Sequence, residues 1–251
     1  MRLRQIALVG ADLAAAEADI RAVLGLDYAY DDPGVGKFGL KNAVFPVGET
    51  FLEVVSPKQP GTTAGRLLEK RGGDGGYMVI LQVEDIGVAR GRIAGAGARV
   101  VEQADLDGGA VAMSHVHPKD VGGAILSLDY MSPWERWQWG GPIWRENRRT
   151  DTSTGIVGAE LQGENPGAMA GRWGEVLGLA PEPANGGWRI ALDGGELRFV
   201  KATDGRGEGL GRFDVAVRDP AAVRASAKAR CLLTDSGDIL LCGTRVRPVQ
   251  A

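Results

Sequence analysis

The sequence predicts an α+β protein built from four βαβββ modules, and three observations support this fold class. Two distant segments, 2–26 and 156–179, share one plan: an apolar run, an acidic break and a helical stretch that ends in VLGL. Two weaker copies of that opening occur at 76–100 and 211–230. Short apolar runs separated by Gly, Pro or Asp follow, as expected of strands joined by hairpins. Such internal repetition indicates a supersecondary unit used several times.

Each opening segment predicts a strand followed by a helix. Gly25 and Gly178 follow the last periodic residues of their helices, where a left-handed glycine closes a helix. The Ala/Arg/Ile-rich helix of the second copy is expected to end at Gly95. Pro220 is placed in the first turn of the helix of the fourth copy.

The apolar runs after the helices predict the remaining strands. In the first copy these runs are KFGL (37–40), NAVFPV (42–47) and TFLEVVSP (50–57). In the third copy they are WRIAL (188–192) and ELRFVKA (196–202). About three strands are therefore expected after each helix.

The repeats predict two halves joined by a connector. Residues 1–130 form the first domain, with modules at 1–56 and 76–130, and residues 155–251 form a second, abbreviated one. The connector, 131–154, has little periodicity and exceeds an ordinary loop in length, so we expect it to pack across one or both halves. Its tryptophans either stack on an aromatic substrate or fasten the connector to a domain or a dimer partner; they are Trp134, Trp137, Trp139 and Trp144.

Composition limits the function classes. With 44% hydrophobic and 24% charged residues and a net charge of -3, the chain is an ordinary globular protein without a basic surface for nucleic acid. Acidic residues occur too early for a secretory signal, and apolar runs such as 77–81 are too short to span a bilayer. We therefore expect a soluble, cytoplasmic protein. Cys231 and Cys242 are expected to be buried thiols in neighbouring strands rather than a disulfide.

The repeated βαβββ plan resembles the vicinal oxygen chelate superfamily, which contains glyoxalase I, methylmalonyl-CoA epimerase, extradiol dioxygenases and bleomycin-resistance proteins. The stretches at 5–26, 51–57 and 117–130 carry the resemblance. The last of them, HPKDVGGAILSLDY, is similar to the closing segment of an epimerase module. The resemblance implies a glyoxalase/bleomycin resistance/dioxygenase-like fold, but it selects no reaction, because one fold hosts many chemistries.

The resemblance also implies a divalent ion on a concave sheet face, held by the first and last strands of each module. The matching positions of the first half are Gln5, Glu53, Met78 and Ser127. Gln5 and Glu53 suit a hard cation, whereas Met78 and Ser127 do not. We therefore expect no metal of the family type and no other cofactor.

In the second half the matching positions are Gly158, Arg198 and Arg212. The arginines would repel a cation. They either hold the carboxylate or phosphate of a ligand, or they turn to solvent or pair with Glu196 and Asp214.

Two histidines leave a metal site open as an alternative. His115 and His117 are two residues apart, so on a strand both would face one way and join Glu53 in a two-His-one-carboxylate set. Against this, His117 precedes Pro118 at an expected turn, where backbone would cap it while His115 packs on the sheet.

Glu53 is the candidate catalytic residue. Side chains of a strand alternate between its two faces, so Glu53 shares one face of an apolar strand with Phe51 and Val55. Burial would raise its pKa and suit it to acid/base work at a carbon next to a carbonyl, with Gln5 orienting it. The alternative is a structural carboxylate bonded to the sheet or surface, with Gln5 as polar filler.

The glycines of 71–77 follow a helix and precede a strand, which indicates a linker rather than a phosphate loop.

These observations predict a glyoxalase-like protein that binds a small carbonyl compound, as a metal-independent isomerase or lyase with Glu53 as acid/base. Its substrate-binding residues are expected to be Gln5, Met78, His115 and Ser127. The first alternative is a non-catalytic sequestering protein of the bleomycin-resistance type. The second is a metal-dependent dioxygenase or glyoxalase. The expected partner is a small molecule, with no nucleic acid or membrane, and a homodimer is left open.

Overall fold

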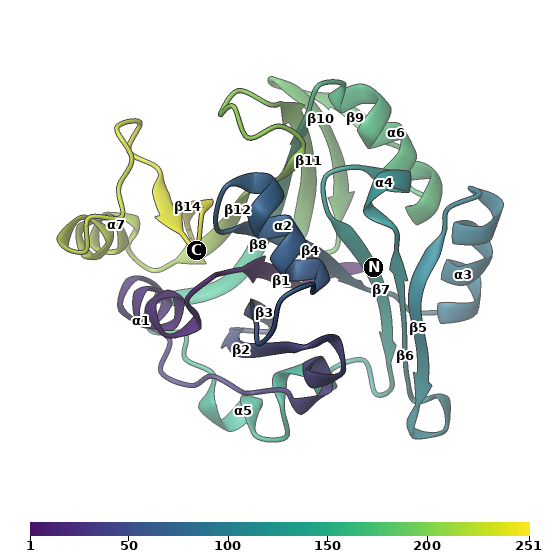
Figure 1. Cartoon of the computed structure of the whole chain (residues 1–251), viewed down its shortest axis with the longest axis horizontal. Helices are drawn as coiled ribbons and strands as arrows, with labels where there is room; N and C mark the ends of the chain where they lie inside the picture. Colours follow the sequence, from purple (N-terminus) through teal and green to yellow (C-terminus); the bar gives the residue numbers. More distant parts are fainter. The chain divides into compact units, whose positions relative to one another are not determined.

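The computed structural model describes residues 1–251 and contains four modules, numbered here along the chain (Figure 1). Module 1 carries fewer strands after its helix than the sequence predicted. It comprises β1 (Arg2–Val9), α1 (Leu13–Leu24), the 3-10 helix η1 (Pro33–Phe38), β2 (Leu40–Val47), β3 (Thr50–Pro57) and α2 (Thr63–Arg71). The predicted strand at 37–40 is wrong, because Lys37 and Phe38 end the 3-10 helix and only Leu40 enters β2. The left-handed Gly39, with φ 71°, breaks the extended backbone that a strand requires.

Module 2 contains the full set of strands. Its elements are β4 (Gly75–Gln82), α3 (Ile86–Gly95), β5 (Val100–Leu106), η2 (Asp107–Gly109), β6 (Val111–Val116), α4 (Pro118–Val121) and β7 (Ile125–Met131). The connector then forms η3 (Gln138–Gly140) and α5 (Trp144–Asn147).

The second half repeats the plan. Module 3 comprises β8 (Ser153–Gly163), α6 (Pro166–Leu177), β9 (Glu182–Ala184), β10 (Gly187–Leu192) and β11 (Gly195–Lys201). Module 4 comprises β12 (Gly209–Val217), α7 (Pro220–Ala229), β13 (Ile239–Leu241) and β14 (Thr244–Gln250). Module 4 is the shortest of the four, in line with the abbreviated second half that the sequence predicted.

The chain divides into two compact units, each described by itself. The 2/3 unit contains modules 2 and 3, and the 1/4 unit contains modules 1 and 4. The 2/3 unit spans Met1–Arg4, Met78–Gln138 and Gly158–Leu210, and the 1/4 unit spans Gln5–Tyr77, Trp139–Val157 and Gly211–Ala251. Each unit takes one module from either side of the connector, whereas the sequence analysis grouped modules along the chain; the proposed domains stay a prediction.

In the 1/4 unit both modules use the same strand arrangement. β3 lies between β1, to which it is parallel, and β2, to which it is antiparallel. β14 lies between parallel β12 and antiparallel β13. Helices α1 and α7 pack against each other (Figure 1). Buried Ile20 and Val23 of α1 and Val223 of α7 contribute to the core of this unit.

In the 2/3 unit the arrangement has one strand more per module. β7 is parallel to β4 and antiparallel to β6, and β5 forms the outer antiparallel strand. Module 3 repeats this arrangement: β11 is parallel to β8 and antiparallel to β10, and β9 forms the outer antiparallel strand. Helices α3 and α6 pack together, and Trp173 of α6 contacts Phe199 edge-on at 5.8 Å.

The helix ends follow the sequence. Gly25 and Gly178 close α1 and α6 in the left-handed region, at φ 67° and 68°, and α3 ends at Gly95. Pro220 is the first residue of α7. These predictions are confirmed because helix termination depends on local backbone chemistry.

The cysteines correct one expectation. Cys231 and Cys242 are free, but Cys231 is exposed and Cys242 only half-buried. Both lie in turns outside the strands, with positive φ angles of 59° and 45°. The apolar residues around the two cysteines predicted strands, whereas the backbone forms a turn at both positions.

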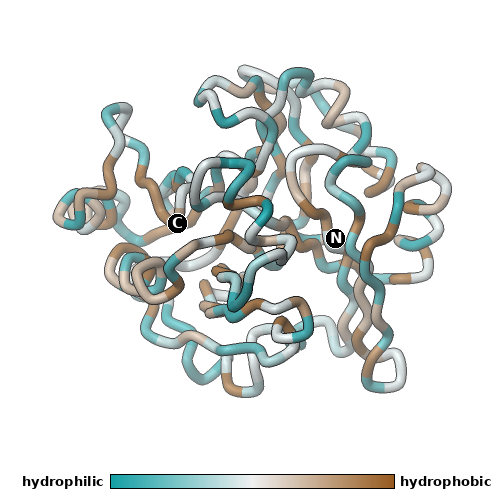
Figure 2. The backbone as a smooth tube through the Cα atoms, viewed as in Figure 1, coloured by the Kyte–Doolittle hydropathy of each residue, from teal (hydrophilic) through white to brown (hydrophobic).

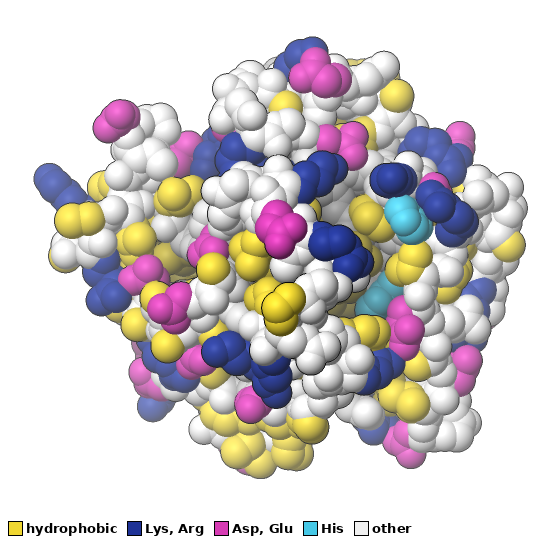
Figure 3. Space-filling view, in the orientation of Figure 1, with side chains coloured by type: hydrophobic (Ala, Val, Ile, Leu, Met, Phe, Trp, Pro, Cys, Tyr) yellow, Lys and Arg dark blue, Asp and Glu magenta, His cyan; other side chains and the backbone are white.

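Hydropathy follows the elements, since the strands carry most of the apolar stretches and the loops most of the polar ones (Figure 2). On the drawn face Lys and Arg side chains alternate with Asp and Glu instead of forming one basic surface (Figure 3). None of the helices has the length and apolar character that crossing a membrane requires.

Candidate functional site

Strand register in module 1 gathers polar side chains on one sheet face. Glu53 lies opposite Ala7 of β1 and Val44 of β2, and residues directly opposite each other point to the same face. By alternation, that face also carries Gln5 and Asn42. Helix α1 covers the other face, where Arg21 lies over the ring of Phe45 at 5.2 Å. Glu53 therefore points away from α1.

Two neutral amides hold the Glu53 carboxylate. Nδ2 of Asn42 donates to Oε1 over 2.5 Å, and Nε2 of Gln5 donates to Oε2 over 2.8 Å. The Asn42 carbonyl oxygen in turn accepts the backbone N–H of Asp32 at 2.9 Å. We call Gln5, Asn42 and Glu53 the amide clamp. It brings together two predicted site residues, Gln5 and Glu53, and one that the sequence analysis missed.

Burial sets the protonation behaviour of Glu53, which is only 7% exposed. Loss of water raises its pKa to about 7, against the lowering effect of the hydrogen bonds from Asn42 and Gln5. The negative charge of Asp32 adds to the rise. A carboxyl whose pKa lies near neutrality can both take and return a proton.

Tyr77 is a second buried titratable group near this face. Burial raises its pKa to about 12, the charge of Glu53 adds to the rise and that of Arg66 on α2 opposes it. The phenol thus keeps its proton at neutral pH. Arg66 itself donates to two uncharged oxygens, Gly61 O and Thr63 Oγ1.

The connector covers part of the face that bears Glu53. Trp144 of α5 packs edge-on against Phe51 at 5.0 Å, and Phe51 shares the face of Glu53. In the 2/3 unit Trp137 is 1% exposed and lies beneath the guanidinium of Arg4 at 5.4 Å. These two tryptophans fasten the connector, one in each unit.

The other predicted binding residues belong to the 2/3 unit. His115 pairs with Ser127 across β6 and β7, and Met78 pairs with Ile125, so Met78, His115 and Ser127 share one face of module 2. Ser127 donates a short hydrogen bond to the buried carboxylate of Asp129. Their role in substrate binding stays a prediction.

The donors at the family's metal positions do not fit a hard divalent ion. Both oxygens of Glu53 accept amide N–H groups, and Gln5 presents its nitrogen, which carries no lone pair for a metal. The Ser127 hydroxyl is engaged by Asp129, and the Met78 thioether is a soft ligand. The structure holds no group of three or more His, Cys, Asp and Glu side chains arranged for a metal. The expectation of no metal or other cofactor stays a prediction.

The histidines follow the backbone-capping alternative. Nδ1 of His117 accepts the N–H of Lys119 at 3.0 Å and caps the short helix α4. Both histidines are half-buried. His115 lies within β6, while His117 lies beyond its end.

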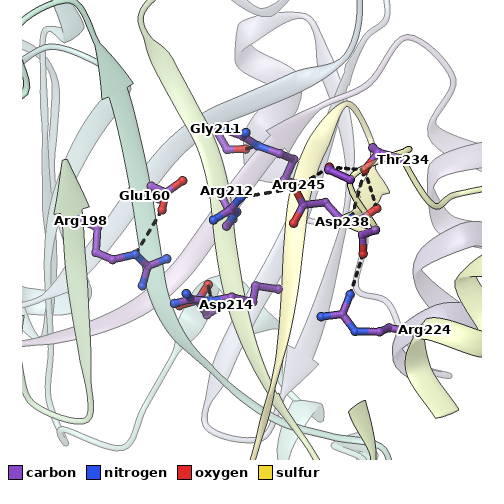
Figure 4. A network of polar contacts seen from close by, with 12 residues as sticks. Glu160, Arg198, Gly211, Arg212, Asp214, Arg224, Thr234, Asp238 and Arg245 are labelled. Atoms are coloured by element: carbon purple, nitrogen blue, oxygen red, sulfur yellow. Dashed lines mark hydrogen bonds and ion pairs between the residues drawn. The ribbon is translucent and has the colours of Figure 1, made fainter. Parts of the chain in front are cut away.

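Charged pairs occupy the corresponding faces of the second half. In module 3 Arg198 donates to Glu160 at 3.3 Å (Figure 4). It also donates to Glu196 at 2.9 Å. In module 4 Arg212 pairs with Asp238 at 3.4 Å (Figure 4). The pairing of Arg198 with Glu196 is the one that the sequence offered as an alternative. Asp214 accepts two N–H groups of Arg247, at 3.0 and 2.5 Å, because strand register places Arg247 directly opposite it.

Four polar residues escaped the sequence analysis. Asn42 opens the apolar run 42–47 and Asp129 lies two residues beyond Ser127, so both carried a usable signal: a polar residue inside an apolar strand. The contacts of Asp32 and Tyr77 depend on tertiary structure and carried none.

Comparisons with known proteins identify relatives of this chain. Residues 6–177 match the family model described as "Glyoxalase-like domain". The ethylmalonyl-CoA/methylmalonyl-CoA epimerase of Cereibacter sphaeroides is 32% identical over 132 residues, which are 51% of this chain and 96% of that protein. A mutant of 4-hydroxymandelate synthase from Streptomyces coelicolor has the same fold, with a TM-score of 0.68 and 16% identity over 92% of this chain and 75% of that one. A methylmalonyl-CoA epimerase from Streptomyces coelicolor, in complex with 2-nitronate-propionyl-CoA, covers 53% of this chain and 96% of its own, with 20% identity and a TM-score of 0.45.

Proposed function

The chain belongs to the glyoxalase-like domain family, as its sequence predicted, and from that premise we propose that it is an isomerase- or lyase-type enzyme acting on a carbon acid. In the proposed reaction Glu53 removes a proton from a carbon next to a carbonyl group. The C–H electron pair moves into an enolate, and the resulting carboxylic acid then returns the proton to carbon. No metal takes part in this scheme, because the donors at the family positions do not fit one.

The observation that carries the proposal is the buried amide clamp. A carbon acid gives up its proton to a base only if the base is ionised, and the return step needs the acid form. Burial disfavours the carboxylate, while the N–H groups of Gln5 and Asn42 favour it. Because burial outweighs the hydrogen bonds and raises the pKa of Glu53 to about 7, both forms of Glu53 are accessible at neutral pH. A buried carboxyl group held in this way supports the proposed role of Glu53 as the base.

The relative named as an ethylmalonyl-CoA/methylmalonyl-CoA epimerase supports a first substrate class. Acyl thioesters with an acidic carbon between two carbonyl groups lose that proton far more readily than simple acids do. We therefore propose such thioesters as the compounds to test first.

Isotope exchange tests the proposal. The protein is incubated in D₂O with methylmalonyl-CoA, and loss of the α-proton is followed by NMR. Wild-type protein should catalyse the exchange, and Glu53→Gln should reduce it by about a hundredfold or more, as expected when an acid/base residue is lost. Glu160→Gln is the matched control, because it also replaces a buried strand carboxylate and should leave exchange unchanged.

Two results would contradict the proposal. Equal exchange by wild type and Glu53→Gln would remove Glu53 from the chemistry. No exchange with any α-acidic thioester or ketone, together with tight binding of a cationic compound that Glu53→Gln weakens, would instead establish the sequestering protein.

A further inference from the structure

One phenol of the chain is buried and yet has no hydrogen-bond partner. Of the four tyrosines only Tyr77 is buried, with 8% of its surface exposed. Its hydroxyl forms no hydrogen bond within the chain, and the hydroxyl oxygen is not sealed from solvent. A buried tyrosine ordinarily satisfies its hydroxyl with a partner. The small exposed part of Tyr77 therefore includes a donor that a bound molecule can use.

Tyr77 and Glu53 lie on either side of β1. The two neighbours of β1 are β3, which carries Glu53, and β4, which carries Tyr77. In the 1/4 unit the end of β1 meets the start of β4, because the backbone N–H of Ala11 donates to Asp74 Oδ1 at 2.8 Å. Since neighbouring strands are about 4.8 Å apart, the backbones of β3 and β4 are separated by roughly 10 Å.

Strand alternation places Tyr77 on the face of the amide clamp. Arg2 Nε donates to Gln82 Oε1 at 3.0 Å, so these two side chains share one face of β1 and β4. Gln5 is three residues from Arg2, and Tyr77 is five residues from Gln82. Both offsets are odd, so Gln5 and Tyr77 share the opposite face. The negative charge of Glu53 acts on the Tyr77 phenol, in agreement with this placement.

The side chain that β1 places beside Glu53 is small. The residue directly opposite Glu53 on β1 is Ala7, so β1 contributes only a methyl group to the face at that position. A compound bound over β1 at Ala7 would have the Glu53 carboxyl group on one side and the Tyr77 hydroxyl on the other.

We propose that Tyr77 is a further catalytic residue, whose hydroxyl donates a hydrogen bond to the carbonyl oxygen of the substrate. This role rests on the proposed function and deepens it, because it supplies the group that stabilises the enolate. Glu53 takes the α-proton, the C–H electron pair forms a carbon–carbon double bond, and the π pair of the carbonyl group moves to oxygen. Tyr77 keeps its proton and donates to that oxygen throughout. A donor aimed at the oxygen where charge develops contributes about a hundredfold or more in rate.

Carbonyl chemical shifts measure the contact without proton transfer. Methylmalonyl-CoA labelled with ¹³C at the thioester carbonyl is bound at saturating concentration to Glu53→Gln protein, which lacks the base. A hydrogen bond withdraws electron density from the carbonyl carbon, so the bound signal should lie at higher chemical shift than the free one. Adding Tyr77→Phe should remove most of that displacement. Tyr130→Phe, which removes the hydroxyl of a half-buried tyrosine in the 2/3 unit, is the matched control and should leave the displacement unchanged.

Rate measurements test the catalytic step. With Glu53 intact, Tyr77→Phe should reduce kcat for α-proton exchange in D₂O by about a hundredfold. KM should change little, because the hydrogen bond strengthens only as charge develops on the oxygen. Tyr130→Phe should keep the wild-type rate. An unchanged rate in Tyr77→Phe, or a carbonyl displacement that persists without the Tyr77 hydroxyl, would overturn the assignment.

The outcomes separate this assignment from the proposed function. If the displacement depends on Tyr77 but wild-type protein exchanges no α-proton, the contact of Tyr77 with the carbonyl oxygen stands and the proposed function fails. If exchange proceeds at the same rate with and without the Tyr77 hydroxyl, the assignment fails alone. If methylmalonyl-CoA neither shifts its carbonyl signal nor exchanges its α-proton, both are overturned.

Discussion

Modules 1 and 3 each bury a carboxylate on a parallel strand pair, and they compensate it in opposite ways. Glu53 of module 1, 7% exposed, meets only the neutral amides of Gln5 and Asn42. Glu160 of module 3, 6% exposed, faces the guanidinium of Arg198, which also reaches Glu196. The same strand arrangement therefore carries a hydrogen-bonded acid in one place and a charged network in the other.

The difference separates a carboxylate that can change its charge from one that is built into an ion pair. A guanidinium requires the ionised partner and leaves a buried charge uncompensated if that partner is neutralised. Amide donors stabilise the anion less and tolerate the acid. Module 1 therefore suits proton transfer, whereas the paired charges of module 3 suit a structural role.

Breaking the ion pair of module 3 should give the largest effect on stability. Arg198→Met leaves Glu160 buried without its guanidinium and should lower the free energy of unfolding by about 3 kcal/mol, measured with urea. Adding Glu160→Leu to this variant should recover most of the loss. Lys201→Met, which breaks an exposed pair with Glu164, serves as the control and should change stability by less than about 1 kcal/mol. Equal effects of Arg198→Met and Lys201→Met would remove the contrast between the modules.

The stability of the protein should also report the pKa of Glu53. The pKa is about 7 in the folded protein against 4.5 for an unperturbed glutamate. Between these values the folded state keeps the proton and the unfolded state releases it, so stability falls as pH rises from 4.5 to 7. The contribution is at most about 3 kcal/mol.

Glu53→Gln should lack this contribution, so the difference in unfolding free energy between wild type and variant should widen in favour of the variant from pH 5 to pH 8. Urea unfolding at both pH values measures it, with exposed Glu164→Gln as the control. A difference that does not change with pH would show that Glu53 titrates as in water, and the contrast with Glu160 would lose its basis.

The smallest effects on stability are expected from substitutions at the helix end that modules 1 and 3 have in common. Gly25→Ala and Gly178→Ala each force a non-glycine residue into the left-handed region at a helix end, which should lower stability by about 1 kcal/mol. The added Cβ would meet Thr152 at position 25 and the flexible Arg92 side chain at position 178, so the loss should be slightly larger at position 25. Thermal unfolding of both variants measures it; stabilisation by either alanine would show that the repeated helix end is not needed.

Much of the fold could be predicted because its signals are local. Helix ends at Gly25, Gly178 and Pro220 depend on the conformations that glycine and proline favour. The repeat of strand and helix patterns then indicated the family, which the comparisons confirm. The strand predicted at 37–40 was wrong. Its apolar residues indicated a strand, but the preceding Pro33 and glycines favour a 3-10 turn.

Less of the candidate site could be predicted. Glu53 and Gln5 were found because a polar residue inside an apolar strand is unusual. Asn42 gave the same signal, but its bond to Glu53 requires the register of β2 on β3, which one sequence does not reveal. The same limit explains why the pairing of Asp214 with Arg247 was not predicted.

By itself, the sequence determined most of the strands and helices and the ends of α1, α3 and α6, since those choices depend on neighbouring residues. Tertiary structure alone decided that Glu53 is surrounded by amides and Glu160 by a guanidinium. That decision depends on strand pairing between distant residues and on exclusion of water. These two conditions control whether a carboxyl group changes its charge near neutral pH.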